Sequence, residues 1–116
     1  MSNAANIALT GLSAFDKKSD VISNNIANVN TDGFKKSRAN MAERAPSGVE
    51  VSTERVNTPG DTVTIEGVKD AERETSNVNM EEEIIALSVN KFNYEANLKT
   101  AETAAEMQGT LFDLFG

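Results

Sequence analysis

Carboxylates are the main side chains in this sequence that could do chemistry. The chain has no Cys and no His, which excludes disulfides, zinc bound by thiolate or imidazole, and His-based acid–base catalysis. The run Glu81, Glu82 and Glu83 could suggest a metal site, but consecutive residues of a helix point in different directions and cannot converge on one ion. We therefore expect no metal site and no cofactor.

Two carboxylate pairs have helical i,i+4 spacing: Asp16 with Asp20, and Glu102 with Glu106. A catalytic pair needs surroundings that separate the two pKa values, and no neighbouring residue in the sequence supplies them. We assign both pairs to solvated helix faces and expect that the protein is not an enzyme.

The last third of the chain predicts one long helix, about 79–114. Asn79 can act as its N-cap, with Glu82 as the return arm of a capping box, and the acidic first turn suits the helix dipole. Steps of four and three residues trace a mostly apolar stripe, and this period is typical of a helix that pairs with another helix. The stripe comprises Met80, Ile84, Leu87, Lys91, Tyr94, Leu98, Ala101, Ala105, Gln108, Phe112 and Phe115.

A second helix is predicted at about 3–30. Its heptad-like stripe comprises Ala5, Ala8, Leu12, Phe15, Ser19, Ile22, Ile26 and Val29. Gly11 either weakens this helix or permits the close approach of another backbone. The amides of Asn24, Asn25, Asn28 and Asn30 either form specific hydrogen bonds or mark a fraying end. Gly33 is suited to the left-handed turn beyond the helix, on which Phe34 can pack.

The middle of the chain predicts little regular structure. Residues 35–46 are mixed and polar, and we interpret them as an irregular linker. Alternating residues in 48–57 and 62–69 flank a Pro-Gly turn signal at Pro59 and Gly60, and predict one β-hairpin. A lone hairpin is marginal in water, so it must lean on the helices or on another subunit. Residues 70–78 look like a loop.

Composition limits the function further. At 116 residues and 39% hydrophobic content, the chain can supply two amphipathic helices but no thick core. It has no apolar run long enough to cross a membrane and no N-terminal pattern of a cleaved signal. Residues 1–46 carry six basic and four acidic side chains, and residues 47–116 carry five and fourteen. This asymmetry suits self-association, and the lack of a basic stripe argues against nucleic acid as a partner.

The sequence resembles the flagellar basal-body rod and hook protein family. Residues 23–36, which read SNNIANVNTDGFKK, look like the N-terminal signature of that family, and Ala8 to Leu12 upstream also fit. Residues 76–83 (SNVNMEEE) and 93–97 (NYEAN) are similar to its C-terminal segment. The two motifs lie at opposite ends in the expected order, and with their helices they cover roughly two thirds of the chain.

The predicted elements give a mainly α fold with two long helices, about 3–30 and 79–114, and a small β-hairpin, about 48–57 and 62–69, between them. The resemblance implies that the two helices pair as coiled coils. We divide the single rod-type subunit 1–116 into an N-terminal helix and signature (1–34), a linker with hairpin (35–78) and a C-terminal helix (79–116).

It also implies a structural, non-catalytic subunit of the proximal-rod type, exported from the cytoplasm by the flagellar export apparatus and polymerised in the periplasmic rod. Expected partners are copies of itself and other rod and basal-body proteins, with no small-molecule substrate, nucleic acid or membrane insertion. The alternative function is a soluble coiled-coil adaptor or regulatory protein.

The residues on which assembly should depend follow from the two stripes and the Asn cluster. Amides buried between helices discriminate against wrong registers, because an unpaired buried amide is costly. We expect the subunit interface to use Leu12, Phe15, Ile22, Asn24, Asn25, Ile26, Asn28, Ile84, Leu87, Tyr94, Leu98 and Phe112, with Gly33 and Asn79 as turn and cap residues.

Overall fold

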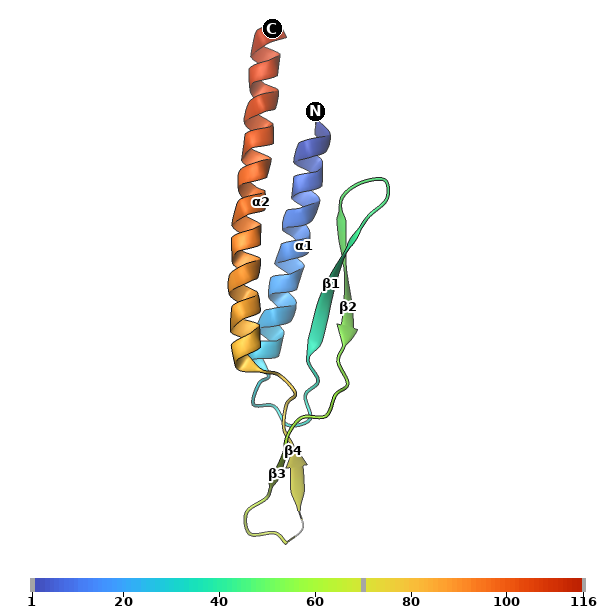
Figure 1. Ribbon diagram of the computed structural model, residues 1–116, viewed down its shortest axis with the longest axis vertical. Helices are drawn as coiled ribbons and strands as arrows, with labels where there is room; N and C mark the ends of the chain where they lie inside the picture. The colour runs from blue at the N-terminus through green and yellow to red at the C-terminus, as the bar shows by residue number, and fades with distance from the viewer. Residues whose placement is uncertain (1, 70, 116) are drawn as a thin grey trace.

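A computed structural model describes residues 2–69 and 71–115 of the chain. The molecule is elongated, with principal extents of 80 × 25 × 13 Å. Three layers lie side by side in its middle part: helix α2 (Met80–Phe115), helix α1 (Ser2–Ala27), and a hairpin of strands β1 (Ser37–Glu43) and β2 (Val49–Arg55). A second, shorter hairpin of β3 (Thr62–Thr64) and β4 (Glu72–Glu74) projects beyond the helices (Figure 1).

The mainly helical fold predicted from the sequence is confirmed, with small differences at the helix ends. α1 ends at Ala27, three residues earlier than predicted, because the chain tightens there: Val29 N donates to Ile26 O, and Asn28 Nδ2 donates to Asn24 O at 2.9 Å. An Asn side chain that donates a hydrogen bond to a helix carbonyl competes with backbone amides for that carbonyl. Gly33, with φ of 71°, completes the turn.

The start of α2 is fixed by its cap. Asn79 Oδ1 accepts a hydrogen bond from Glu82 N at 3.2 Å, which satisfies one of the free amides at the helix N-terminus. The Glu82 carboxylate, expected to reach back to Asn79, lies instead 3.9 Å from Lys36 Nζ. The acidic first turn therefore also faces the basic segment that leads into β1.

The strand pairing predicted from the sequence is wrong. β1 pairs antiparallel with β2, with Ser37 opposite Arg55 and Glu43 opposite Val49, so the segment interpreted as a linker contains a strand. β3 pairs with β4, which lies within residues 70–78, the segment predicted to be a loop. The inward positions of β1 include Ser37 and Ala39, which are too small to stand out as an apolar alternation.

The Pro-Gly signal marks a close backbone crossing rather than a hairpin turn. A Cβ at Gly60 would lie 1.9 Å from Thr75 O, so only glycine lets the two segments approach this closely. We call residues 56–61 and 75–79 the neck. Asn77 holds it together: its Oδ1 accepts from Lys36 N at 2.7 Å, and its Nδ2 donates to Val56 O and Thr58 O at 2.8 and 2.9 Å.

α1 is the middle layer and contacts α2 on one side and both strands of the first hairpin on the other. Its buried apolar side chains are few, and half of them are alanines: Ala8, Leu12, Ala14 and Ile22. Gly11 is also buried, and a Cβ there would lie 2.5 Å from Asn97 Nδ2, which donates to Ala8 O at 2.6 Å. Gly11 therefore makes room for this amide of α2.

Paired Gly→Ala substitutions test this role of Gly11. Alanine should stabilise an exposed helix position by up to about 1 kcal/mol, and Gly109, which has no neighbouring atom within 4 Å of an added Cβ, should show this gain. Gly11→Ala should lose the gain, because the new methyl displaces the Asn97 amide from Ala8 O, at a cost of about 1 kcal/mol. Urea denaturation measures both, and equal stabilisation by the two substitutions would contradict this role.

A carboxylate at the end of β4, next to the neck, has a lowered pKa. Glu74 Oε1 accepts hydrogen bonds from Lys35 Nζ and, at 3.1 Å, from Gly60 N, and the Lys35 bond is the larger cause of the lowered pKa. A lowered folded-state pKa stabilises the folded form at and above the ordinary value, and this contribution is lost as pH falls through the folded value.

We expect the Gly60 amide resonance of the folded protein to titrate with a midpoint below 4.5, the ordinary value for Glu, as the Glu74 carboxylate takes up a proton. Glu74→Gln should abolish this step while leaving the neutral-pH spectrum of the helices unchanged. A midpoint at or above 4.5 would show that the contacts with Lys35 and Gly60 do not hold the carboxylate in solution.

Candidate subunit interface

α2 faces α1 with polar side chains placed seven residues apart. Glu83, Asn90 and Asn97 follow one another at this spacing, which keeps them on one face of the helix. Asn90 Nδ2 donates to Phe15 O and Ser19 Oγ at 2.7 and 2.6 Å, and the other two reach Asn25 and Ala8. We call Glu83, Asn90 and Asn97 the polar seam.

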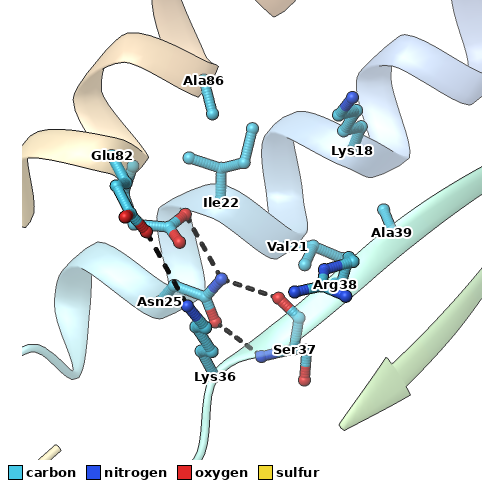
Figure 2. A pocket seen from close by; sticks show the side chains of 11 residues that line it. Lys18, Val21, Ile22, Asn25, Lys36, Ser37, Arg38, Ala39, Glu82 and Ala86 are labelled. Atoms are coloured by element: carbon cyan, nitrogen blue, oxygen red, sulfur yellow. Dashed lines mark hydrogen bonds and ion pairs between the residues drawn. The ribbon is translucent and has the colours of Figure 1, made fainter. Parts of the chain in front are cut away.

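Asn25 joins all three layers at one end of the polar seam. Its Oδ1 accepts from Ser37 N at 3.0 Å and its Nδ2 donates to Ser37 O at 2.8 Å, so the side chain pairs with β1 as a neighbouring strand would. The same Nδ2 lies 3.3 Å from Glu83 Oε2. Figure 2 shows these hydrogen bonds as dashed lines. Asn25 is 1% exposed, so they form away from water.

The polar seam restricts how the two helices can pair. Buried amides must find partners, and a shift of one helix along the other would leave them unpaired at about 1–3 kcal/mol each. One acceptor is already unsatisfied: Asn90 Oδ1 is buried and has no hydrogen-bond partner within residues 2–69 and 71–115. The seam therefore fixes register and adds little hydrophobic burial.

Because polar residues occupy the inner face of α2, most of its large apolar residues are exposed. Ile85, Val89 and Phe92 are 65%, 54% and 70% exposed, and the same helical face continues toward the C-terminus. Steps of three, four and seven residues keep this set on one face. We call it the outer stripe: Ile85, Val89, Phe92, Ala96, Thr103, Met107 and Leu114. An exposed apolar strip of this length is typical of an interaction surface.

The stripe predicted on α2 lies between these two faces. Leu87, Ala101 and Gln108 are half-buried. The large members farther from α1 are exposed by 37–65%: Ile84, Tyr94, Leu98 and Phe112. The face of α2 that contacts α1 therefore differs from the predicted one. The prediction considered only apolar residues and gave no weight to Glu83, Asn90 and Asn97.

The α1 residues predicted at the subunit interface have three different environments. Leu12, Ile22 and Asn25 are buried within the chain itself. Phe15, Ile26 and Asn28 are half-buried, and Asn24 is exposed. Asn24 and Asn28 bond to each other, since Asn28 Nδ2 lies 3.3 Å from Asn24 Oδ1. The assignment of these residues to contacts between subunits stays a prediction.

Neither a metal centre nor a membrane span was found in the part of the chain that the structure describes. No group of three or more Asp and Glu side chains there could hold an ion. Among those residues, neither helix has a stretch that is long and apolar enough to cross a bilayer.

Comparison with known proteins identifies the family. Residues 4–35 match the family described as "Flagella basal body rod protein", and residues 73–114 match "Flagellar basal body rod FlgEFG protein C-terminal". The chain is 35% identical to flagellar basal-body rod protein FlgG of Buchnera aphidicola, in an alignment that covers 55% of this chain. It spans about a third, 34%, of that relative's length.

The chain belongs to the flagellar basal-body rod protein family, whose members are structural and non-catalytic. The matched segments contain nearly all of α1, with its Asn cluster, and nearly all of α2, with the polar seam. This result confirms the family resemblance that the two sequence motifs indicated.

Substitution of two neighbouring asparagines of α1 should change the free energy of unfolding by very different amounts. Asn25→Ala leaves the Ser37 backbone and the Glu83 carboxylate without partners in a buried site, and should destabilise the fold by about 2–3 kcal/mol. Asn24→Ala removes only an exposed contact and should change stability by less than about 0.5 kcal/mol. Chemical denaturation measures both, and a similar effect of the two variants would contradict the role assigned to Asn25.

Proposed function

We propose that this chain is a structural subunit of the flagellar rod that assembles through the outer stripe of α2. Its partners are copies of itself and other rod and basal-body proteins. The proposal depends on one observation: α2 turns polar side chains toward α1 and exposes large apolar side chains on its opposite face. A helix that exposes Ile85, Val89 and Phe92 along one face gains by covering them with another chain.

The thin shape of the subunit supports the same proposal. Its buried apolar side chains are few, so the isolated molecule has little hydrophobic stabilisation for a chain of 116 residues. Packing of α2 against a neighbour would add about 1.5–3 kcal/mol for each large apolar side chain that becomes fully buried. Assembly would therefore both join and stabilise the subunits.

The three predicted segments take distinct parts in this proposal. Segment 1–34 supplies the middle layer, segment 35–78 supplies the two hairpins, and segment 79–116 supplies the helix that meets the neighbour. Membership of the rod family further supports export from the cytoplasm through the flagellar export apparatus and a final location in the periplasmic part of the rod.

The outer stripe can be tested in cells that lack the chromosomal copy. Val89→Ser with Phe92→Ser removes two exposed apolar side chains and should leave the fold intact, but it should sharply reduce the amount of the chain in purified basal bodies and reduce swimming. Glu95→Ser, an exposed polar position about one turn farther along α2, is the matched control and should behave as wild type.

Circular dichroism of the purified variants separates misfolding from failed assembly. The account predicts melting curves close to wild type for both variants, because surface substitutions change stability by about 0.5 kcal/mol or less. Basal bodies that contain the Val89→Ser, Phe92→Ser variant at the wild-type level would overturn the proposed function of the outer stripe.

A further inference from the structure

The C-terminal turns of α2 lie beyond the end of α1. α2 has 36 residues and α1 has 26, and Ala4 near the start of α1 lies beside Thr103, Ala104 and Met107. Residues 108–115, which we call the overhang, project past this point (Figure 1). Phe112, Leu114 and Phe115 are 65%, 77% and 83% exposed. The overhang is thus an aromatic tip without a partner helix among the described residues.

The overhang is also acidic. It contains Asp113, the preceding turn contains Glu106, and α2 has no basic residue after Lys99. A surface that is complementary to it should combine an apolar hollow with cations at the rim.

Such a hollow exists near the opposite end of the helices, between α1, β1 and the first turns of α2. This basal pocket has a volume of about 320 Å³. Apolar atoms of Val21, Ile22, Ala39 and Ala86 contribute to its walls, and Lys18, Lys36 and Arg38 contribute cations. Its two carboxylates already have partners, since Glu83 lies by Asn25 and Glu82 lies 3.9 Å from Lys36.

Two cations of the basal pocket remain available to an incoming carboxylate. Lys18 forms no ion pair in the described parts of the chain, and Arg38 has only an exposed contact with Glu54 at 3.6 Å. Figure 2 shows Lys18 and Arg38 on the side of the pocket away from Glu82.

We propose that the overhang of one copy of this chain occupies the basal pocket of a second copy. Phe112 and Phe115, one turn apart, cover the apolar walls, and the Asp113 carboxylate faces Lys18 and Arg38. The overhang cannot reach its own pocket, because residues 82 and 112 lie about 45 Å apart along α2 at about 1.5 Å per residue. The inference rests on the proposed function and names the surface by which successive copies join.

This contact uses two different surfaces and so need not close into a dimer. A heterologous contact repeats in one direction and gives an open helical array. Copies joined in this way would advance by about 45 Å along the helix direction, the distance from pocket to overhang.

Cysteine cross-linking tests this contact. The natural chain has no Cys, so copies of it form no disulfides with one another until cysteines are introduced. In cells that carry Ala39→Cys with Phe115→Cys as the sole copy, mild oxidation of purified basal bodies with copper phenanthroline should give a ladder of disulfide-linked dimers, trimers and longer chains. Either single variant should stop at dimers or below. Ser52→Cys with Phe115→Cys, which moves the first cysteine to an exposed position of the same hairpin, is the matched control and should give no ladder.

Charge reversal provides a second test if the cysteine variant fails to assemble. Lys18→Glu with Arg38→Glu should lower the amount of the chain in basal bodies at least tenfold, and adding Asp113→Lys should restore a large part of it. Lys17→Glu with Arg44→Glu changes the net charge equally, at exposed residues that do not line the basal pocket, and should have little effect.

The outcomes separate this inference from the proposed function. Assembled basal bodies without a ladder, cross-links to a different rod protein only, or no rescue by Asp113→Lys would each overturn the overhang contact and leave the role of the outer stripe standing. Normal incorporation of the Val89→Ser, Phe92→Ser variant would instead overturn the proposed function while the ladder could still form.

Discussion

Hydrogen bonds from three polar side chains of α2 determine how the rest of the molecule is arranged. Glu83, Asn90 and Asn97 lie at a seven-residue spacing and take the face that an ordinary helical hairpin would fill with Leu or Ile. The contact between α1 and α2 is specific, because the buried amides find hydrogen-bond partners in only one register. The same polar residues reduce the apolar surface that the contact buries. The large apolar residues of α2 are consequently displaced to its outer faces.

Side-chain amides have the same function elsewhere in the fold. Asn25 pairs with both backbone groups of Ser37, and Asn77 bridges Lys36, Val56 and Thr58. In both places a side-chain amide bonds to backbone N–H and C=O groups, as a neighbouring strand would. It thereby connects segments that are distant in the sequence. A thin molecule with few buried apolar side chains can keep a defined shape in this way, because hydrogen bonds specify geometry where burial is scarce.

Periodicity and turn chemistry predicted the two helices, the cap at Asn79 and the turn at Gly33, because these features depend on local sequence. Strand pairing could not be predicted in the same way. β1 has small inward residues, and Gly60 is required by a backbone crossing with Thr75 that the local sequence does not show. The inner face of α2 was missed for a related reason: Asn90 and Asn97 look like solvated residues until their partners on α1 are known. Their seven-residue spacing with Glu83 was the available signal.

Hydroxyl-radical footprinting of the purified subunit and of isolated basal bodies tests the central claim most directly, since Phe92 and Met107 are reactive side chains of the outer stripe and are 70% and 63% exposed in the free chain. The account predicts that both are oxidised rapidly in the free subunit and are strongly protected in the assembled rod. Equal oxidation of Phe92 and Met107 in the two states would show that this face of α2 stays in water after assembly, and would contradict the account.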